Sequence, residues 1–274
     1  MPEALDPTIA AHYALGQEGA RLGSPGRPTL EAVRTRVLLA RHLPDPPAVV
    51  LDVGGGTGVY ALPLAQQGYQ VHLIDPWPGH VEAAAHASAG QPDTRLASTQ
   101  VGDARHLAAA DRSVDAVLLL GPLYHLIEMT DRAAALAEAF RVLRPGGVLF
   151  AAGISRFAST YDGIRSGYVV DRYFDSLVEG VLVDGVHRNR DPVAHPQFFT
   201  LAYFHRPQEL REELMAAGFG SVDLVAIEGP GSFQHGLDLA DGAQRQAVLR
   251  AIERVEREPS LLGASSHLMG IGIR

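Results

Sequence analysis

The stretch from residue 49 to residue 75 constrains the fold of this chain more than any other. It reads VVLDVGGGTGVYALPLAQQGYQVHLID and places four glycines within residues 54–58, between an apolar run and a helix-like segment. Glycine loses more backbone freedom on folding than any other residue, so such a cluster indicates a tight turn or a close approach to another group. The stretch therefore predicts a strand, a glycine-rich turn, a helix and a second strand that ends at Asp75.

The same alternation continues along the chain. Short apolar runs occur at residues 95–103, 114–121 and 147–154, and two more, at 221–229 and 266–274, resemble closing strands. Continuous apolar runs are typical of strands that are buried on both faces of a parallel sheet. Because helical patterns separate these runs, we expect a Rossmann-like seven-stranded α/β sheet with helices on both faces.

Helices are predicted where apolar residues recur at helical spacing. They cover residues 29–43, 131–143, 207–218 and about 242–257. Thr29 is suited to the N-cap of the first of them. Residues 144–147, RPGG, are expected to form a turn.

Composition excludes several kinds of site. The chain of 274 residues has no cysteine, which excludes disulfides, thiolate metal ligands and cysteine nucleophiles. Its formal net charge is −8, so nucleic acid is not an expected partner. The N-terminus does not resemble a secretory signal, and no apolar run approaches the roughly 20 residues that cross a bilayer. We therefore expect a soluble, cytoplasmic protein without a membrane partner.

Acidic residues end both of the first two predicted strands. Asp52 closes the first, and Asp75 closes the second, where a carboxylate can accept hydrogen bonds from ribose hydroxyls. Gly56, Gly58 and Ala61 also fit a loose dinucleotide fingerprint, so an NAD-dependent oxidoreductase is one interpretation. The other is the pattern acid-x-Gly-x-Gly-x-Gly, in which an anion at Asp52 would repel a diphosphate and attract a cationic amine.

Several motifs occur in an order that resembles one known family, the class I S-adenosylmethionine-dependent methyltransferases. These motifs are LDVGGGTG, VHLIDPW, VGDARHL, LLLGPLYHL and LRPGGVLF, and the resemblance covers about residues 48–154, with a looser one over 207–274. It implies S-adenosylmethionine as the cofactor, and a sheet that includes an antiparallel closing strand. The dinucleotide interpretation accounts for neither the Asp103 motif nor the segment after residue 119.

The resemblance also implies roles for individual residues. The glycine-rich loop would lie along the methionine part of the cofactor, Asp75 would hold the ribose, Asp103 would reach the adenine amino group, and Trp77 would stack on adenine. The expected cofactor-binding residues are Tyr13, Arg21, Asp52, Gly54, Gly55, Gly56, Gly58, Asp75, Pro76, Trp77, Asp103, Ala104, Arg105, Gly121 and Leu123.

Methyl transfer from a sulfonium is a direct displacement, for which alignment and exclusion of water can provide much of the acceleration. A base is needed only if the acceptor loses a proton. The family places the acceptor against residues 121–126, so Tyr124 and His125 are the candidate catalytic residues. The acceptor atom is an oxygen, nitrogen or carbon of a small molecule. An RNA or protein methyltransferase and a non-catalytic cofactor sensor remain alternatives.

Two further segments have the composition of a functional site. Tyr13, Glu18 and Arg21 are expected on an N-terminal helical lid, with Arg21 bound to the cofactor carboxylate and Tyr13 over the sulfonium. Residues 155–205 interrupt the strand-and-helix alternation, which suits an insertion that covers the substrate. Its candidate acceptor-binding residues are His187, Asn189, Phe199 and Tyr203. The spacing of the histidines matches no compact ligand motif, so no metal is expected.

These expectations describe a single methyltransferase domain over residues 1–274. It consists of an N-terminal helical lid region (1–47), a cofactor-binding core (48–154), a substrate-cap insertion (155–205) and the C-terminal part of the core sheet (206–274).

Overall fold

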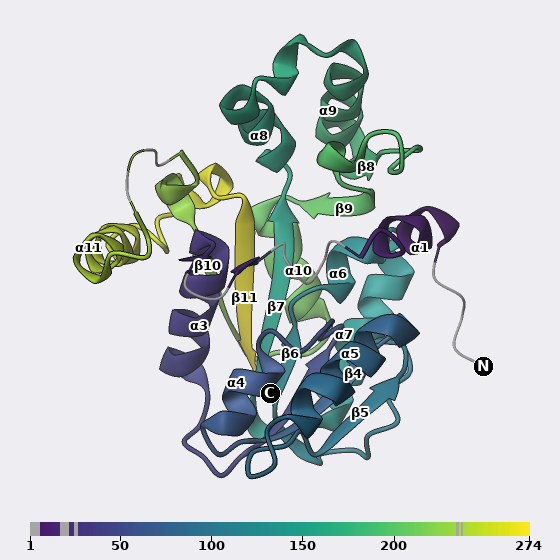
Figure 1. The fold of residues 1–274 in the computed structure, drawn as a ribbon, viewed down its shortest axis with the longest axis vertical. Coiled ribbons are helices and arrows are strands. Elements are labelled where there is room, and N and C mark those ends of the chain that lie inside the picture. Colours follow the sequence, from purple (N-terminus) through teal and green to yellow (C-terminus); the bar gives the residue numbers. More distant parts are fainter. Residues whose placement is uncertain (1–5, 17–21, 25–26, 234–235, 237) are drawn as a thin grey trace.

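The structure is a computed structural model that describes residues 6–16, 22–24, 27–233, 236 and 238–274. Its centre is a sheet whose main path runs in the order β10-β11-β7-β6-β3-β4-β5 (Figure 1). The strands are β3 (Val49–Val53), β4 (Gln70–Asp75), β5 (Ser98–Val101), β6 (Val114–Leu119), β7 (Leu143–Ser155), β10 (Ser221–Ala226) and β11 (His267–Ile273). The predicted seven-stranded Rossmann-like path is confirmed.

Strand direction also agrees with the family pattern. The five strands from β7 to β5 run parallel, whereas β11 runs antiparallel to both of its neighbours, β7 and β10. Two strands of the insertion lengthen the sheet beyond the prediction: β9 (Leu201–His205) pairs parallel with the end of β7, and β8 (Val186–Arg188) pairs with β9. A separate two-stranded sheet joins β1 (Gly23–Ser24) to β2 (Arg27–Pro28).

Helices cover both faces of the sheet because alternate strand residues point to opposite sides. In β6, Ala116 and Leu118 pack with α3 (Leu30–His42), α4 (Ala61–Gln66) and α5 (Pro78–Ala89). Val117 and Leu119 face the other way, toward α7 (Met129–Val142) and α10 (Pro207–Ala216). The remaining helices are α1 (Pro7–Tyr13), α6 (Pro122–His125), α8 (Ala158–Ser166), α9 (Arg172–Asp184) and α11 (Gly242–Glu253), with short 3-10 turns at Tyr168–Val170, Pro196–Phe198, Gly229–Phe233 and Leu262–Ala264.

The local predictions differ from the structure at few places. The hydroxyl of Thr29 accepts a hydrogen bond from the amide of Ala32 and caps α3, as expected. The predicted turn at residues 144–147 lies inside β7, where the register against β6 shifts. α11 ends four residues earlier than predicted, at Glu253.

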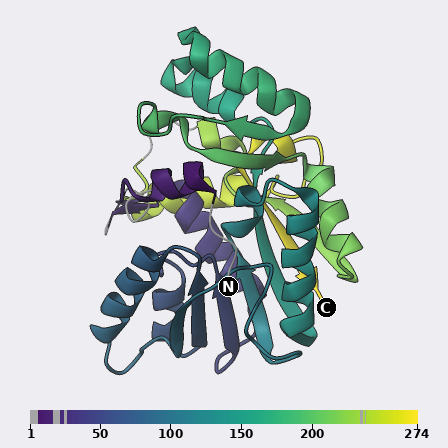
Figure 2. The ribbon, with the colours of Figure 1, turned by 90° about the vertical axis from the view of Figure 1, so that its right-hand side faces the viewer.

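Two segments lie over the carboxyl ends of the parallel strands. The insertion folds as α8, α9, β8 and β9 at the end of β7 (Figure 1), and α1 lies beside α6 and below β9 in both views (Figures 1 and 2). Open α/β sheets bind ligands at this end. Within the described residues, no helix has the length and apolar character needed to cross a membrane.

Candidate active site

The turn after β3 is pressed between the sheet and the start of α6. Gly54 has a φ of 70°, in the left-handed region, and a Cβ placed on it would lie 2.8 Å from the ring of Pro122. A Cβ on Gly55 would lie 2.8 Å from Oδ2 of Asp52. The amide of Gly54 donates a hydrogen bond to the carbonyl of Ile74 at 2.7 Å. These approaches explain why the sequence has glycine at both positions.

The acid that ends β4 holds the glycine turn in place. Oδ2 of Asp75 accepts a 2.8 Å hydrogen bond from the amide of Gly56, and Oδ1 accepts one of 2.9 Å from the amide of Trp77. Nδ1 of His80 lies 3.1 Å from the same Oδ1. A carboxylate offers about four acceptor positions, so these three contacts leave about one for a ligand.

Asp52, at the end of β3, is a buried carboxyl group with unused hydrogen-bonding capacity. It is 1 % exposed, and its Oδ2 has no hydrogen-bond partner among the described residues. The pKa of Asp52 is raised to about 7: burial is the largest cause, the charge of Asp75 adds to it, and a hydrogen bond from the amide of Ala61 opposes both. A ligand that brings a positive charge or a donor to this oxygen would relieve the cost of burying it.

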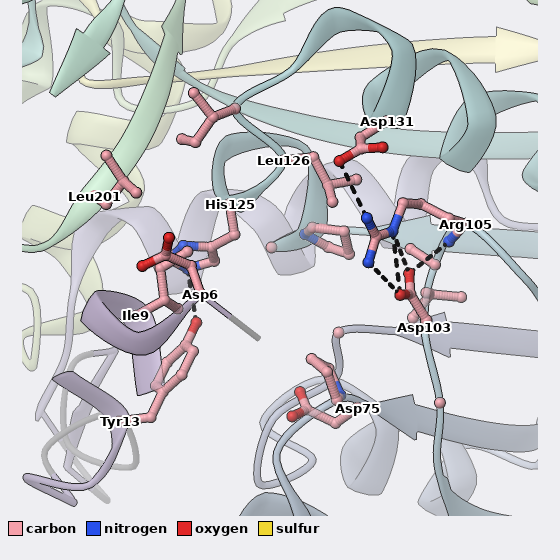
Figure 3. A pocket seen from close by; sticks show the side chains of 18 of the residues that line it. Asp6, Ile9, Tyr13, Asp75, Asp103, Arg105, His125, Leu126, Asp131 and Leu201 are labelled. Atoms are coloured by element: carbon pink, nitrogen blue, oxygen red, sulfur yellow. Dashed lines mark hydrogen bonds and ion pairs between the residues drawn. The ribbon is translucent and has the colours of Figure 1, made fainter. Parts of the chain in front are cut away.

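Asp103 forms a carboxylate–guanidinium group with Arg105. Nη2 of Arg105 donates to Oδ2 of Asp103 at 2.6 Å, and its Nη1 donates to Asp131 at 3.1 Å (Figure 3). Burial alone would raise the pKa of Asp103, but the hydrogen bonds and charge of Arg105 outweigh it, and the pKa lies below its usual value. Asp103 therefore stays ionised at neutral pH as a hydrogen-bond acceptor at the cavity wall.

Two adjoining cavities connect these acids. One of about 660 Å³ extends from Asp75 past Asp103 to α1 and the segment after α6. One of about 60 Å³ contains Asp52 and the glycine turn. Both are lined by Tyr13, Gly54, Asp75 and Gly121, so together they form one crevice. The larger volume is in the range of small-molecule and cofactor sites.

A hydrogen bond between α1 and α6 crosses this crevice. The hydroxyl of Tyr13 lies 2.7 Å from Nε2 of His125, and its ring stands edge-on to the rings of His125 and His80 (Figure 3). The rings of Tyr124 and Phe199 also lie close to His125, at 4.8 and 5.9 Å between centroids. The imidazole thus sits in an aromatic surrounding at the cavity wall.

Most of the predicted cofactor-binding residues line the crevice. They are Tyr13, Asp52, Gly54, Gly55, Gly56, Asp75, Pro76, Asp103, Ala104, Arg105 and Gly121, and the catalytic candidates Tyr124 and His125 lie with them. Gly58, Trp77 and Leu123 line neither cavity: Gly58 packs against Leu62, Trp77 lies beside Gly79, and Leu123 is fully buried in the core. Glu18 and Arg21 lie outside the described residues.

The four acceptor-binding candidates of the insertion lie elsewhere. His187 is 1 % exposed; its Nε2 lies 2.6 Å from the carbonyl of Phe198, and burial lowers its pKa. The amide nitrogen of the fully buried Asn189 donates to the carbonyl of Phe199 at 2.7 Å. Tyr203 packs its ring under the guanidinium of Arg132 at 3.7 Å.

None of these four residues is among those lining the two cavities, so the structure does not bring them into the crevice. The physical reason is that the insertion needs a core of its own, and it uses its aromatic and polar side chains to build one. Only Phe199 comes near the crevice, through its contact with His125. Leu201, the first residue of β9, is the residue of the insertion that lines the larger cavity.

Several lining residues carried no signal in the sequence. They are Asp6, Pro7 and Ile9 of the N-terminal segment, and Ile127, Glu128 and Asp131 after α6. The last three directly follow the predicted acceptor segment 121–126, so extending that segment into the next helix would have included them. His80, five residues after Asp75, was also missed as the partner of that acid.

Comparison with known proteins assigns the family. Residues 51–151 match a family model described as a methyltransferase domain. The chain is 30% identical over 243 residues to a malonyl-[acyl-carrier protein] O-methyltransferase of Dechloromonas aromatica, covering 85% of this chain and 74% of that protein. The chain belongs to the class I S-adenosylmethionine-dependent methyltransferases.

Two further comparisons agree with this assignment. A demethylmenaquinone methyltransferase of Deinococcus radiodurans is 32% identical over 189 residues, which are 67% of this methyltransferase and 73% of that protein. The crystal structure of an S-adenosylmethionine-dependent methyltransferase from Mesorhizobium loti shares the fold with a TM-score of 0.56, at 18% identity, over 90% of this chain and 100% of that one.

The cofactor of this methyltransferase is therefore S-adenosylmethionine, and not the dinucleotide of the alternative interpretation. The crevice fits its chemistry. Oδ2 of Asp52 is a buried acceptor without a partner among the described residues, as a cationic methionine group requires, and the remaining acceptor position of Asp75 suits a ribose hydroxyl.

Proposed function

We propose that this methyltransferase transfers the methyl group of S-adenosylmethionine to a small molecule held in the larger cavity. The observation that carries the proposal is the single crevice formed by the two cavities around Tyr13, Gly54, Asp75 and Gly121. Its small end has the size and acidity for the methionine part of a cofactor. Its large end extends beyond the acids at the strand ends and leaves room for an acceptor.

Asp52, Asp75 and Asp103 would hold the cofactor. Asp52 would face the methionine ammonium, Asp75 would accept a ribose hydroxyl, and Asp103 would accept from the adenine amino group. Arg105 would keep Asp103 ionised and fixed in orientation through the hydrogen bonds between them. The cofactor supplies an electrophilic methyl group on a sulfonium.

The acceptor would lie between α1, the segment Leu126–Glu128 and Leu201 of β9, which line the cavity beyond those acids. These residues align the nucleophile and exclude water, and such alignment is the main requirement of a displacement. His125 would take the proton of an acceptor that must lose one. The two relatives described above act, by their names, on malonyl-[acyl-carrier protein] and on demethylmenaquinone, and in both the methylated group would be small.

The acidic lining argues against RNA as the acceptor. Five carboxylates line the larger cavity, and Arg105 is the one Lys or Arg side chain among its described lining residues. Phosphate recognition requires the opposite balance of charge. The chain as a whole carries a net charge of −8.

Calorimetry tests the cofactor part of the proposal. We expect S-adenosylmethionine and its demethylated product, S-adenosylhomocysteine, to bind the wild-type protein at one site, and NAD to give no heat. The variant Asp75→Asn should bind the product more weakly, whereas Asp93→Asn, in the exposed loop after α5, should bind it as the wild type does. Equal binding by the Asp75→Asn variant would remove Asp75 from the cofactor site.

Turnover tests the acceptor part. We expect release of S-adenosylhomocysteine from a panel of small molecules and none from RNA or from folded proteins. Turnover on RNA or on a protein alone would refute a small-molecule acceptor.

A further inference from the structure

We propose that the acceptor is an uncharged aromatic hydroxyl compound, a phenol, whose hydroxyl occupies the position against His125 that Tyr13 holds in this structure. This inference rests on the proposed function and names the substrate class of the same site. Three independent observations support it: the Tyr13–His125 hydrogen bond, the apolar and aromatic wall, and the charges of the cavity.

The hydrogen bond supplies the geometry. A phenol hydroxyl lies 2.7 Å from Nε2 of His125, at ordinary hydrogen-bond length. That phenol comes from α1, and 112 positions in the sequence separate it from the histidine. It therefore reaches the imidazole from outside the α/β core, as an acceptor must. Tyr13 also lines both cavities, so its ring stands at the junction where cofactor and acceptor meet.

The wall around this position suits a flat apolar ring. Ile9, Leu126 and Leu201 line the cavity near His125 (Figure 3). The rings of Tyr124 and Phe199 add aromatic surface next to the imidazole. Aromatic rings bury a large apolar area and gain further from edge-to-face contacts with one another.

The charges of the cavity select against an acidic acceptor. Asp6 and Glu128 line its outer part, and no Lys or Arg side chain among the described lining residues faces them. Arg105 is engaged by Asp103 and Asp131. A carboxylate acceptor would meet these like charges in a partly desolvated space, which raises its free energy of binding.

With a hydroxyl acceptor, His125 can act as a general base. Nε2 of His125 accepts the hydroxyl proton while a lone pair of the phenol oxygen forms the bond to the methyl carbon. The carbon–sulfur bond breaks, and its electron pair stays on the sulfur. The products are a methyl ether, S-adenosylhomocysteine and an imidazolium, which returns its proton to solvent. A neutral amine would attack through its lone pair without this base.

A matched set of probes tests the substrate class. The probes are 2-naphthol, 2-naphthoate and 2-naphthylmethylamine, which share one ring system and are neutral, anionic and cationic at pH 7.5. Each is titrated by calorimetry into the protein saturated with S-adenosylhomocysteine, and each is assayed for turnover with S-adenosylmethionine. We expect 2-naphthol to bind at least tenfold more tightly than 2-naphthoate and to be the probe that is methylated. The carboxylates of the cavity attract the ammonium of 2-naphthylmethylamine, but the protonated amine has no lone pair and should not be methylated.

Tighter binding of 2-naphthoate, methylation of 2-naphthylmethylamine in place of 2-naphthol, or no binding of 2-naphthol at millimolar concentration would overturn the inference. If S-adenosylhomocysteine itself fails to bind, the proposed function fails first, so the two failures are distinguishable.

Two variants test the position. Tyr13→Phe removes the competing hydroxyl and should lower the dissociation constant of 2-naphthol severalfold, because the probe no longer displaces a hydrogen bond. Tyr161, in α8, packs on Phe233 and lines neither cavity. Tyr161→Phe is therefore the matched control and should bind 2-naphthol as the wild type does. His125→Gln should lower the kcat for 2-naphthol by about 10²- to 10⁴-fold. Weaker naphthol binding by Tyr13→Phe, or full activity of His125→Gln, would contradict the assignment.

Discussion

Asp52→Asn is expected to make the cofactor-free protein more stable while it weakens cofactor binding. The side chain is 1 % exposed, and one of its oxygens has no hydrogen-bond partner among the described residues. Burial is the first cause that raises its pKa, from 3.8 to about 7, and the charge of Asp75 is the second. At pH 8 the folded protein therefore carries a buried anion that asparagine would replace by a neutral group of the same shape.

The magnitude follows from the linkage between protonation and folding. A shift of about three pKa units at about 1.4 kcal/mol per unit corresponds to about 4 kcal/mol as an upper limit. Well below pH 4, the carboxyl group is protonated in both states and costs nothing. As the pH rises toward 7, the unfolded chain releases the proton while the folded protein keeps it, so the stability of the wild type falls across this window. Above pH 7 the loss is complete.

Urea denaturation of both proteins between pH 4 and pH 8.5 measures this difference. We expect the free energies of unfolding to be closest at pH 4 and to separate progressively up to pH 7, with the variant more stable. Asp93→Asn, an exposed substitution of the same kind, should show no such divergence. A constant difference at all pH values, or a less stable variant at pH 8, would refute the reasoning from burial.

The same variant should bind S-adenosylmethionine more weakly, by about 1.5–3 kcal/mol if Asp52 meets a charged donor. Calorimetry at pH 6 in two buffers of different ionisation enthalpy would detect the proton that the wild type releases when the cofactor cation binds. We expect that release to be lost in Asp52→Asn. Proton release of equal size in both proteins would assign it to another group.

Three other substitutions test separate parts of the site. Gly54→Ala should lower Tm and cofactor affinity, because a Cβ at this position would lie 2.8 Å from the ring of Pro122. Gly146 is the control: it has a similar positive φ but open space around it, so Gly146→Ala should lower the free energy of unfolding only by the left-handed strain of about 1–2 kcal/mol. Asp75→Asn should lower cofactor affinity by about 1.5–3 kcal/mol, measured by calorimetry, since about one acceptor position is available. Arg132→Met should destabilise the protein by about 3–5 kcal/mol in urea denaturation, because Glu213 would lose its main buried partner.

Much of the fold could be predicted because its signals are local. Strands buried on both faces require continuous apolar runs. A Cβ on Gly54 would lie 2.8 Å from the ring of Pro122, so the turn requires glycine at this position. Asp52 and Asp75 lie at the carboxyl ends of β3 and β4, and Asp103 follows the end of β5 by two residues. Their positions at one edge of the sheet therefore followed from the strand assignments alone.

The insertion could not be read in the same way. His187, Asn189 and Tyr203 have the composition of a binding pocket, yet hydrogen bonds and stacking within the insertion bury them or hold them in place. A core made of polar and aromatic side chains looks like a ligand site when only the residue types are known. Burial and partner distances separate the two, and both depend on tertiary contacts that a single sequence does not reveal.

The N-terminal helix α1 shows that residues far apart in the sequence come together to form the crevice. Tyr13 reaches His125 through its hydroxyl and His80 through its ring, and His80 in turn contacts Asp75. One tyrosine thus touches both the residue that would accept the acceptor's proton and His80, the partner of the acid that we propose binds the ribose. A cofactor that engages Asp75 would disturb the His80 end of this arrangement, and a phenol at His125 would displace its other end. Binding of the two ligands is therefore expected to be coupled through α1, and the coupling should decrease in Tyr13→Phe.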